Sequence, residues 1–223
     1  MKEVFRHDSP FMVGLRRFFL LVQLNILWAI CCLPVVTIGA ATVSMYRTVA
    51  ALRTDMEAGE ETVELFSFFF RAFRQEFRQS TLLMLVKLAA VALLAADFRV
   101  AAIVADGLSG AVKLICWIPT VLFALVSGVV FPLQAKFSNT VFQTAKNAAL
   151  IAFSNPSVSI SVAFLNAIPV LLFLKAPEFF VRTFLFWIAI GVSGICWLNW
   201  MMLNRVFQKY IPEETDTTLE VTK

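Results

Sequence analysis

Few of the residue types that carry soluble-enzyme chemistry occur in this sequence. Only 15% of the 223 residues are charged, and the single histidine, His7, lies near the N-terminus. A metal site or catalytic triad built on histidine is therefore nearly excluded. The cysteines all fall within apolar runs and lack zinc-type spacing, which favours small apolar fillers over metal ligands or a redox pair. They are Cys31, Cys32, Cys116 and Cys196.

Phosphate-binding loops and intramembrane carboxylates are missing as well. No GxxxxGK[ST] stretch occurs, and no GxGxxG motif follows a strand. Proton-coupled transporters carry carboxylates within their spans, whereas here Asp97 and Asp106 fall at or beyond the end of an apolar run. The acidic cluster at 55–64 reads as a solvated linker. We predict no catalytic site, no metal and no cofactor, and therefore a protein that is not an enzyme.

Apolar residues are in excess instead. They make up 60% of the chain, whereas a soluble domain carries roughly 45–50%. A spanning helix needs about 20 mostly apolar residues. The hydropathy predicts an all-α polytopic transmembrane helical bundle of about six crossings. It forms a single membrane domain over 1–211, followed by a disordered tail at 212–223. The spans are expected at about 18–34, 35–52, 80–97, 112–131, 157–174 and 183–203.

The region 18–52 crosses either once or twice, and the basic residues favour two crossings. A single crossing would place eight Lys and Arg residues inside and ten outside, against the positive-inside tendency. A short hairpin around Pro34 leaves both termini cytoplasmic and places fourteen inside and only Arg99, Lys113, Lys175 and Arg182 outside. Hydroxyl groups in the second span can bond back to their own helix or to neighbouring helices, and Arg47 can reach the inner surface. The inside set is Lys2, Arg6, Arg16, Arg17, Arg47, Arg53, Arg71, Arg74, Arg78, Lys136, Lys146, Arg205, Lys209 and Lys223.

Two cytoplasmic stretches are candidate contact surfaces. The range 65–78 predicts an amphipathic helix that either lies in the headgroup plane or docks a partner. A third alternative, stacking of carbohydrate on its rings, is disfavoured because sugars prefer Trp and Tyr. The second stretch, 132–147, is polar, and Pro132 suits the first turn of a helix. The candidate docking residues of the first stretch are Phe66, Phe69, Phe70, Phe73 and Phe77 on one face, with Arg71 and Arg74 mostly on the other.

Lys87 is the one charge well inside an apolar run, and charge at mid-membrane is a functional candidate because it is costly. Its alternative role is structural, since it lies only about 10 Å along a helix from Ser80 and can snorkel toward the inner headgroups. Asn25 and Asn199 also fall within spans. They either bond neighbouring helices or, together with Lys87, face a solute such as a neutral sugar.

Five ordered segments resemble the YesL-like family of bacterial integral membrane proteins of unknown function. They are Asn25-Ile26-Leu27-Trp28, the run from Leu33-Pro34 to Ala41-Thr42, Phe69-Phe70-Arg71-Ala72-Phe73-Arg74, Phe131-Pro132-Leu133 with Phe137-Ser138-Asn139-Thr140, and Leu203-Asn204-Arg205-Val206-Phe207. The resemblance covers about 15–210. It implies a multi-pass protein of the bacterial inner membrane, encoded near carbohydrate-uptake transporters, and it supplies no catalytic residues.

Two functions are compatible with these observations. The first is an accessory or regulatory component of bacterial carbohydrate uptake, which contacts an ABC-type permease through the phenylalanine-rich helix. The second is a stand-alone small-solute transporter that works as a homo-oligomer, with Lys87, Asn25 and Asn199 along its path. The lipid bilayer is a partner in both cases, and no nucleic-acid partner is expected.

Overall fold

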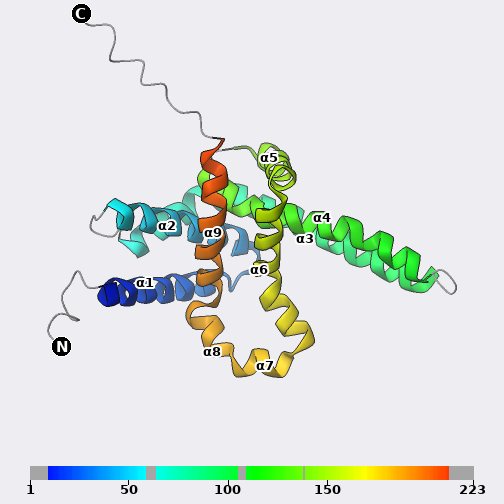
Figure 1. Cartoon of the computed structure of the whole chain (residues 1–223), viewed down its shortest axis with the longest axis horizontal. Coiled ribbons are helices and arrows are strands. Elements are labelled where there is room, and N and C mark those ends of the chain that lie inside the picture. Colours follow the sequence, from blue (N-terminus) through cyan, green and yellow to red (C-terminus); the bar gives the residue numbers. More distant parts are fainter. Residues whose placement is uncertain (1–9, 59–63, 105–108, 138, 211–223) are drawn as a thin grey trace, which may run out of the picture.

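The computed structural model describes residues 10–58, 64–104, 109–137 and 139–210. The regular structure in these ranges is helical (Figure 1). The tail predicted to be disordered at 212–223 lies outside them, as do Asp106 and most of the acidic stretch 55–64. The α-helices are α1 (Pro10–Cys31), α2 (Ile38–Ala58), α3 (Leu65–Val104), α4 (Ser109–Lys136), α5 (Val141–Ser154), α6 (Pro156–Lys175), α7 (Pro177–Arg182), α8 (Phe184–Phe186) and α9 (Val192–Gln208); η1 (Val35–Thr37) is a 3₁₀ turn and η2 (Trp187–Gly191) a π-helix.

Within the described ranges, six helical segments are long and apolar enough to cross a membrane, which confirms the predicted fold class. Each overlaps one of the six predicted ranges. The segments are Gly14–Cys31, Val35–Asp55, Leu65–Ile103, Leu114–Lys136, Pro156–Lys175 and Phe184–Gln208. The last one runs through α8, η2 and α9 without leaving helical geometry.

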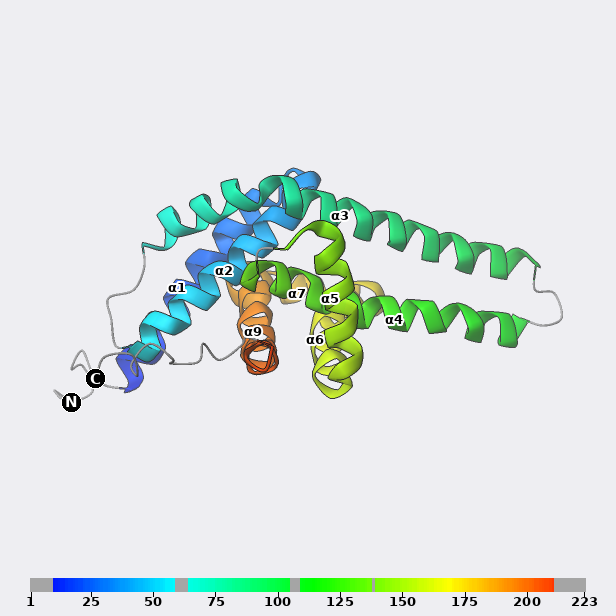
Figure 2. The ribbon, with the colours of Figure 1, turned by 90° about the horizontal axis from the view of Figure 1, so that it is seen from above.

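The predicted hairpin forms around Pro34. Helix α1 ends at Cys31, and the extended backbone of Pro34 leads through η1 into α2. Thr37 fixes this turn, because its Oγ1 donates to the backbone oxygens of Cys31 and Pro34, both at 2.5 Å. Trp28 then bonds across the hairpin from Nε1 to Thr42 Oγ1 at 3.2 Å. Figures 1 and 2 show α1 and α2 side by side.

Helix α2 lies at the centre of the packing, and its small residues make this possible. A Cβ on Gly39 would lie 2.3 Å from the backbone oxygen of Ser80, so glycine lets α2 approach α3 closely. Ser44 and Thr48 are fully buried, and their hydroxyls donate back to Ala40 and Ser44 oxygens at 2.7 and 2.8 Å. These two hydroxyls therefore bond to their own helix, whereas the Thr42 hydroxyl also accepts from Trp28 of the neighbouring helix.

Helix α3 joins two stretches that the sequence separates. The amphipathic stretch 65–78 and the span 80–97 form one helix of 40 residues, about 60 Å long at 1.5 Å per residue. No proline or glycine interrupts the sequence from Leu65 to Val104, so the backbone hydrogen bonds continue. A perpendicular crossing of a hydrocarbon core about 30 Å thick needs only about half of this length.

Pro132 does not begin a helix, contrary to the prediction. It lies inside α4, which continues to Lys136, and the next helix begins only at Val141. A capping box supplies that start: Gln143 N–H donates to Thr140 Oγ1, and Thr140 N–H donates to Gln143 Oε1. The end of α4 is buried by its neighbours, and this tertiary packing outweighs the local preference of proline for a first turn.

The helices extend in different directions from the centre. In Figure 1 the antiparallel pair α3–α4 extends to one side and α1–α2 to the other, while α9 and the upper part of α6 run across them. Figure 2 shows the outer parts of α3 and α4 leaving the rest of the molecule together. A cavity lies where α2, α3, α4 and α6 meet.

Candidate functional site

The cavity has a volume of about 640 Å³. Apolar and aromatic side chains form most of its wall, including Phe98, Phe123 and Phe131. Its polar side chains come from four helices: Thr42 and Tyr46 from α2, Lys87 from α3, Thr120 and Ser127 from α4, and Asn166 from α6. A mostly apolar cavity with a few polar groups is typical of a small-molecule site.

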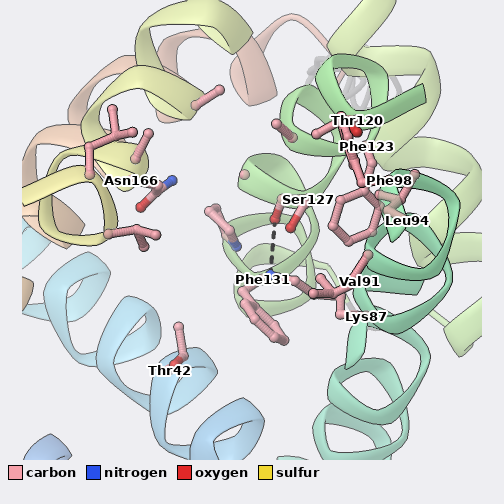
Figure 3. A pocket seen from close by; sticks show the side chains of 18 of the residues that line it. Thr42, Lys87, Val91, Leu94, Phe98, Thr120, Phe123, Ser127, Phe131 and Asn166 are labelled. Atoms are coloured by element: carbon pink, nitrogen blue, oxygen red, sulfur yellow. Dashed lines mark hydrogen bonds between the residues drawn. The ribbon is translucent and has the colours of Figure 1, made fainter. Parts of the chain in front are cut away.

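Among the described residues, Lys87 is the only charged side chain in this wall. Its Nζ lies 3.5 Å from the backbone oxygen of Ser127 and 4.3 Å from the centre of the Phe131 ring. Figure 3 shows the side chain entering from α3 and ending between these two groups. No carboxylate that the structure describes lies within ion-pairing distance of this ammonium. The solute-facing position predicted for Lys87 thus coincides with a cavity, while its role stays a prediction.

Asn199 is fully buried on α9, directly behind the cavity. Its Nδ2 donates to Tyr46 Oη and to Asn166 Oδ1, both at 3.1 Å. Tyr46 and Asn166 both belong to the cavity wall, so Asn199 orients two polar residues of the wall without being part of it. In Figure 3 the amide nitrogen of Asn166 points into the open space.

Asn25 lies away from the cavity and holds the π-helix η2. Its Nδ2 donates to the Trp187 and Ile188 oxygens at 2.9 and 2.5 Å, and its Oδ1 accepts from the backbone N–H of Ser193 at 2.8 Å. A π-helix leaves part of the normal i→i−4 bonding unmade. One buried amide therefore satisfies the backbone at both ends of this irregular segment, which corresponds to the helix-bonding alternative for Asn25.

A second polar group lies at the end of the bundle where α2, α3, α4 and α5 meet. Arg47 Nη2 lies 2.7 Å from Glu76 Oε1, and Glu76 Oε2 accepts from Gln134 Nε2 at 2.7 Å. Gln134 Oε1 accepts from Thr144 Oγ1 at 2.8 Å and from Gln79 Nε2 at 3.2 Å. We call these five residues the Arg47–Glu76 network. The network forms an ion pair between α2 and α3, and each of its five side chains has a hydrogen-bonding or ion-pair partner within it.

The five phenylalanines of the predicted docking face divide into two groups. Phe69 is fully buried and Phe73 is half-buried, whereas Phe66, Phe70 and Phe77 are 57%, 47% and 38% exposed. The buried face of this part of α3 consists of Leu65, Phe69, Ala72, Glu76, Ser80 and Leu83, which recur at intervals of three or four residues. The phenylalanine stripe is offset from that face, so one edge packs inside and the other remains outside.

The exposed part of the docking face carries both apolar and basic groups. Arg71 and Arg74 are exposed, and the Arg71 guanidinium lies 5.5 Å from the centre of the Phe68 ring. These two arginines line a surface depression together with Ser67, Phe70 and Gln75. On the neighbouring α5, Phe142 is 78% exposed.

The described residues contain no group of three or more His, Cys, Asp or Glu side chains placed to bind a metal ion. Cys31, Cys32, Cys116 and Cys196 are all free thiols.

Comparison with known proteins finds a family model and a curated relative. The model described as "Protein of unknown function, DUF624" matches residues 21–98. "Uncharacterized protein YesL" of Bacillus subtilis (strain 168) is 33% identical over 146 residues, which cover 64% of this chain and 66% of that protein. The chain is thus similar to YesL and to this family of unknown function. No solved structure gives a significant match.

The part matched by the family model runs from α1 into α3, so it includes several of the residues described above. Asn25, Arg47, Glu76 and Lys87 all lie within it. The aligned region spans just under two thirds of the Bacillus relative.

Sequence reasoning missed Glu76 and Gln134, which are central to the Arg47–Glu76 network. Glu76 is 9% exposed and Gln134 is 1% exposed, although both lie in stretches that read as polar surface. One signal was available: Glu76 continues the three-and-four spacing of Leu65, Phe69 and Ala72, so it falls on the face that packs inward.

Proposed function

We propose that this membrane protein is a non-enzymatic accessory or regulatory component of bacterial carbohydrate uptake that contacts an ABC-type permease. The carbohydrate context rests on the family resemblance. The observation that supports contact with a partner is the exposed edge of α3, where Phe66, Phe70 and Phe77 stand next to Arg71 and Arg74. An apolar stripe at helical spacing is a common way for a helix to dock on another protein.

The position of this edge on a rigid base strengthens the proposal. The adjoining buried face of the same helix carries Phe69 and Glu76, which the core and the Arg47–Glu76 network hold in place. A docking face that is already ordered loses less conformational entropy on binding than a flexible segment does. The edge of α3 is therefore suited to specific contact.

Co-purification in mild detergent from a bacterial host that carries the gene tests this proposal. We expect a permease in stoichiometric amount, and we expect Phe66→Ser with Phe70→Ser to abolish its recovery while the protein still inserts. Phe164→Ser is the matched control, because Phe164 is 64% exposed on α6, far along the chain from this edge. Phe69→Ser is unsuitable, since it places a polar group in the core. Recovery of the protein without a permease would contradict the proposal.

A second candidate function rests on a different observation, the cavity beside Lys87. In a stand-alone transporter acting as a homo-oligomer, Lys87 and Asn166 would line the path of a sugar. Asn199 would orient the Asn166 side chain through its hydrogen bond. Purified protein in vesicles should then carry flux of a labelled sugar, and Lys87→Met should remove it. Vesicles without flux for any candidate sugar would exclude this function.

The proposed setting is the bacterial inner membrane with both termini cytoplasmic. Its support is the distribution of Lys and Arg residues, fourteen against four, around the six apolar segments. Single cysteines at exposed Gln75 and Lys146 should react with an impermeant thiol reagent only from the cytoplasmic side, and one at Lys175 only from outside, in a cysteine-free background. Reaction of Gln75→Cys from outside would contradict this topology.

A further inference from the structure

The ammonium of Lys87 has hydrogen-bonding capacity that its surroundings leave unused. An ammonium group has three N–H donors. Here it has one long bond, at 3.5 Å, to a backbone oxygen, and the face of one ring. A charge held in an apolar region without an opposite charge is costly, and a bound anion would remove that cost. The cavity therefore favours a ligand that brings a negative charge to Nζ.

The rest of the cavity favours an apolar body for the same ligand. Around Lys87 the wall continues with Leu94, Phe98 and Phe123. Its volume of about 640 Å³ falls within the range of about 300–1,000 Å³ that is usual for small-molecule sites. A small hydrated anion would leave most of this apolar wall uncovered, whereas a hydrocarbon chain would fill it.

The mouth of the cavity is apolar too. Val91 on α3 and Val170 and Leu171 on α6 belong to its lining and are still 49%, 55% and 48% exposed. All three lie in segments apolar enough to span the bilayer. The exposed part of the lining is therefore apolar and belongs to segments suited to a bilayer, which favours a ligand that arrives from the bilayer.

We propose that this cavity binds an anionic amphiphile, a molecule with a hydrocarbon chain and one carboxylate or phosphate head group. The head-group oxygens accept from Lys87 Nζ, and the chain lies along the apolar wall. The Asn166 Nδ2 group faces the same space, and no described acceptor is bonded to it, so it supplies a second donor. The site does not depend on contact with a permease, and its ligand differs from the neutral sugar of a transport path.

The test is direct binding to the full chain, delipidated and held in a neutral maltoside detergent. The probes are hexadecanoate, hexadecanol, a single-chain acyl glycerol phosphate and inorganic phosphate. The charge-assisted bond should make hexadecanoate bind at least about tenfold more tightly than hexadecanol. A similar affinity for the acyl glycerol phosphate would show that the head group is read as a charge, and a preference between the two would identify the head group.

Five variants, of which two are controls at exposed positions, locate the site. Lys87→Met should remove the preference for hexadecanoate over hexadecanol, and Lys87→Arg should keep it. Lys146→Met, at an exposed lysine on α5, is the control for loss of a positive charge. Ala167→Phe fills the cavity and should weaken the binding of all three chain-bearing probes about tenfold, whereas Ala89→Phe, at an exposed position of α3 outside the lining, should not.

Three results would overturn the proposal. Equal affinity of the unmodified protein for hexadecanoate and hexadecanol would show that no anion is recognised, and this comparison needs no variant. A preference that survives Lys87→Met would place the anion elsewhere. Binding of inorganic phosphate as tight as that of the acyl glycerol phosphate would show a small-anion site that does not use the apolar wall.

Discussion

Two half-buried cations among the described residues, Arg47 and Lys87, differ in what surrounds them. Arg47 meets Glu76 at 2.7 Å, and Gln134 completes the hydrogen bonding of that carboxylate. Lys87 meets only a backbone oxygen and a ring. A cation that is paired with a carboxylate of the protein is tied to the folded state, because removing either charge leaves the other uncompensated. A cation that lacks an opposite charge retains the capacity to bind something else.

The largest effect is expected from breaking the paired cation. Glu76→Gln removes the charge that Arg47 faces and should lower the free energy of unfolding by about 3 kcal/mol. Thermal or denaturant unfolding in neutral detergent measures this. The double variant Arg47→Met with Glu76→Leu should recover much of the loss, since no charge is then left unpaired. Arg78→Met, at an exposed position of α3, should change stability by less than about 0.5 kcal/mol.

If the single and double variants were equally unstable, packing rather than charge pairing would account for the effect. The contrast between the two cations would then lose its basis.

The second largest loss of stability is expected at Asn25, a neutral side chain whose amide nitrogen and oxygen are both hydrogen-bonded. Asn25→Leu leaves the Ser193 amide and the Trp187 and Ile188 oxygens without their partner, at a cost of about 2 kcal/mol. Hydrogen exchange at the Ser193 amide should also become faster. The control is Gln23→Leu, an exposed site on the same helix. Unchanged exchange at Ser193 would show that η2 does not need this amide.

A smaller loss of stability is expected at Thr144, at the edge of the Arg47–Glu76 network. Thr144→Val keeps the shape of a buried side chain and removes only the bond to Gln134 Oε1, which still accepts from Gln79. We expect a loss of about 1 kcal/mol. Thr54→Val, at an exposed hydroxyl on α2, should cost less than that. A loss as large as that of Glu76→Gln would show that the network acts as one cooperative unit.

Much of the fold could be predicted from composition and hydropathy. Six apolar runs became six long apolar helical segments because the bilayer requirement depends on run length, which a sequence states directly. The turn at Pro34 followed in the same way from one residue that interrupts a helix. These are local properties, and they need no knowledge of which helix meets which.

Pairing between helices could not be predicted in this way. Arg47 and Glu76 lie on different helices with a loop between them, and Gln134 comes from a third helix. Glu76 reads as part of a basic and aromatic surface until α2 is known to cover that side of α3. Lys87 stood out because charge is rare in apolar runs, but the cavity that gives its position meaning is formed by α2, α4 and α6 as well.

The smallest effect on stability is expected from the unpaired cation itself. Lys87→Met removes a charge that has no described counter-charge and keeps a long flexible side chain in the same space. The lost contact with Phe131 is worth about 0.5–2 kcal/mol, and the desolvation that the charge no longer requires offsets it. Delipidated Lys87→Met should therefore unfold within about 1 kcal/mol of the unmodified protein. Adding hexadecanoate should stabilise the unmodified protein and the Lys87→Arg variant but not Lys87→Met, because only a ligand that binds the folded state shifts the equilibrium. A loss near that of Glu76→Gln, with no response to the ligand, would make Lys87 a structural residue like Arg47 and remove the difference between the two cations.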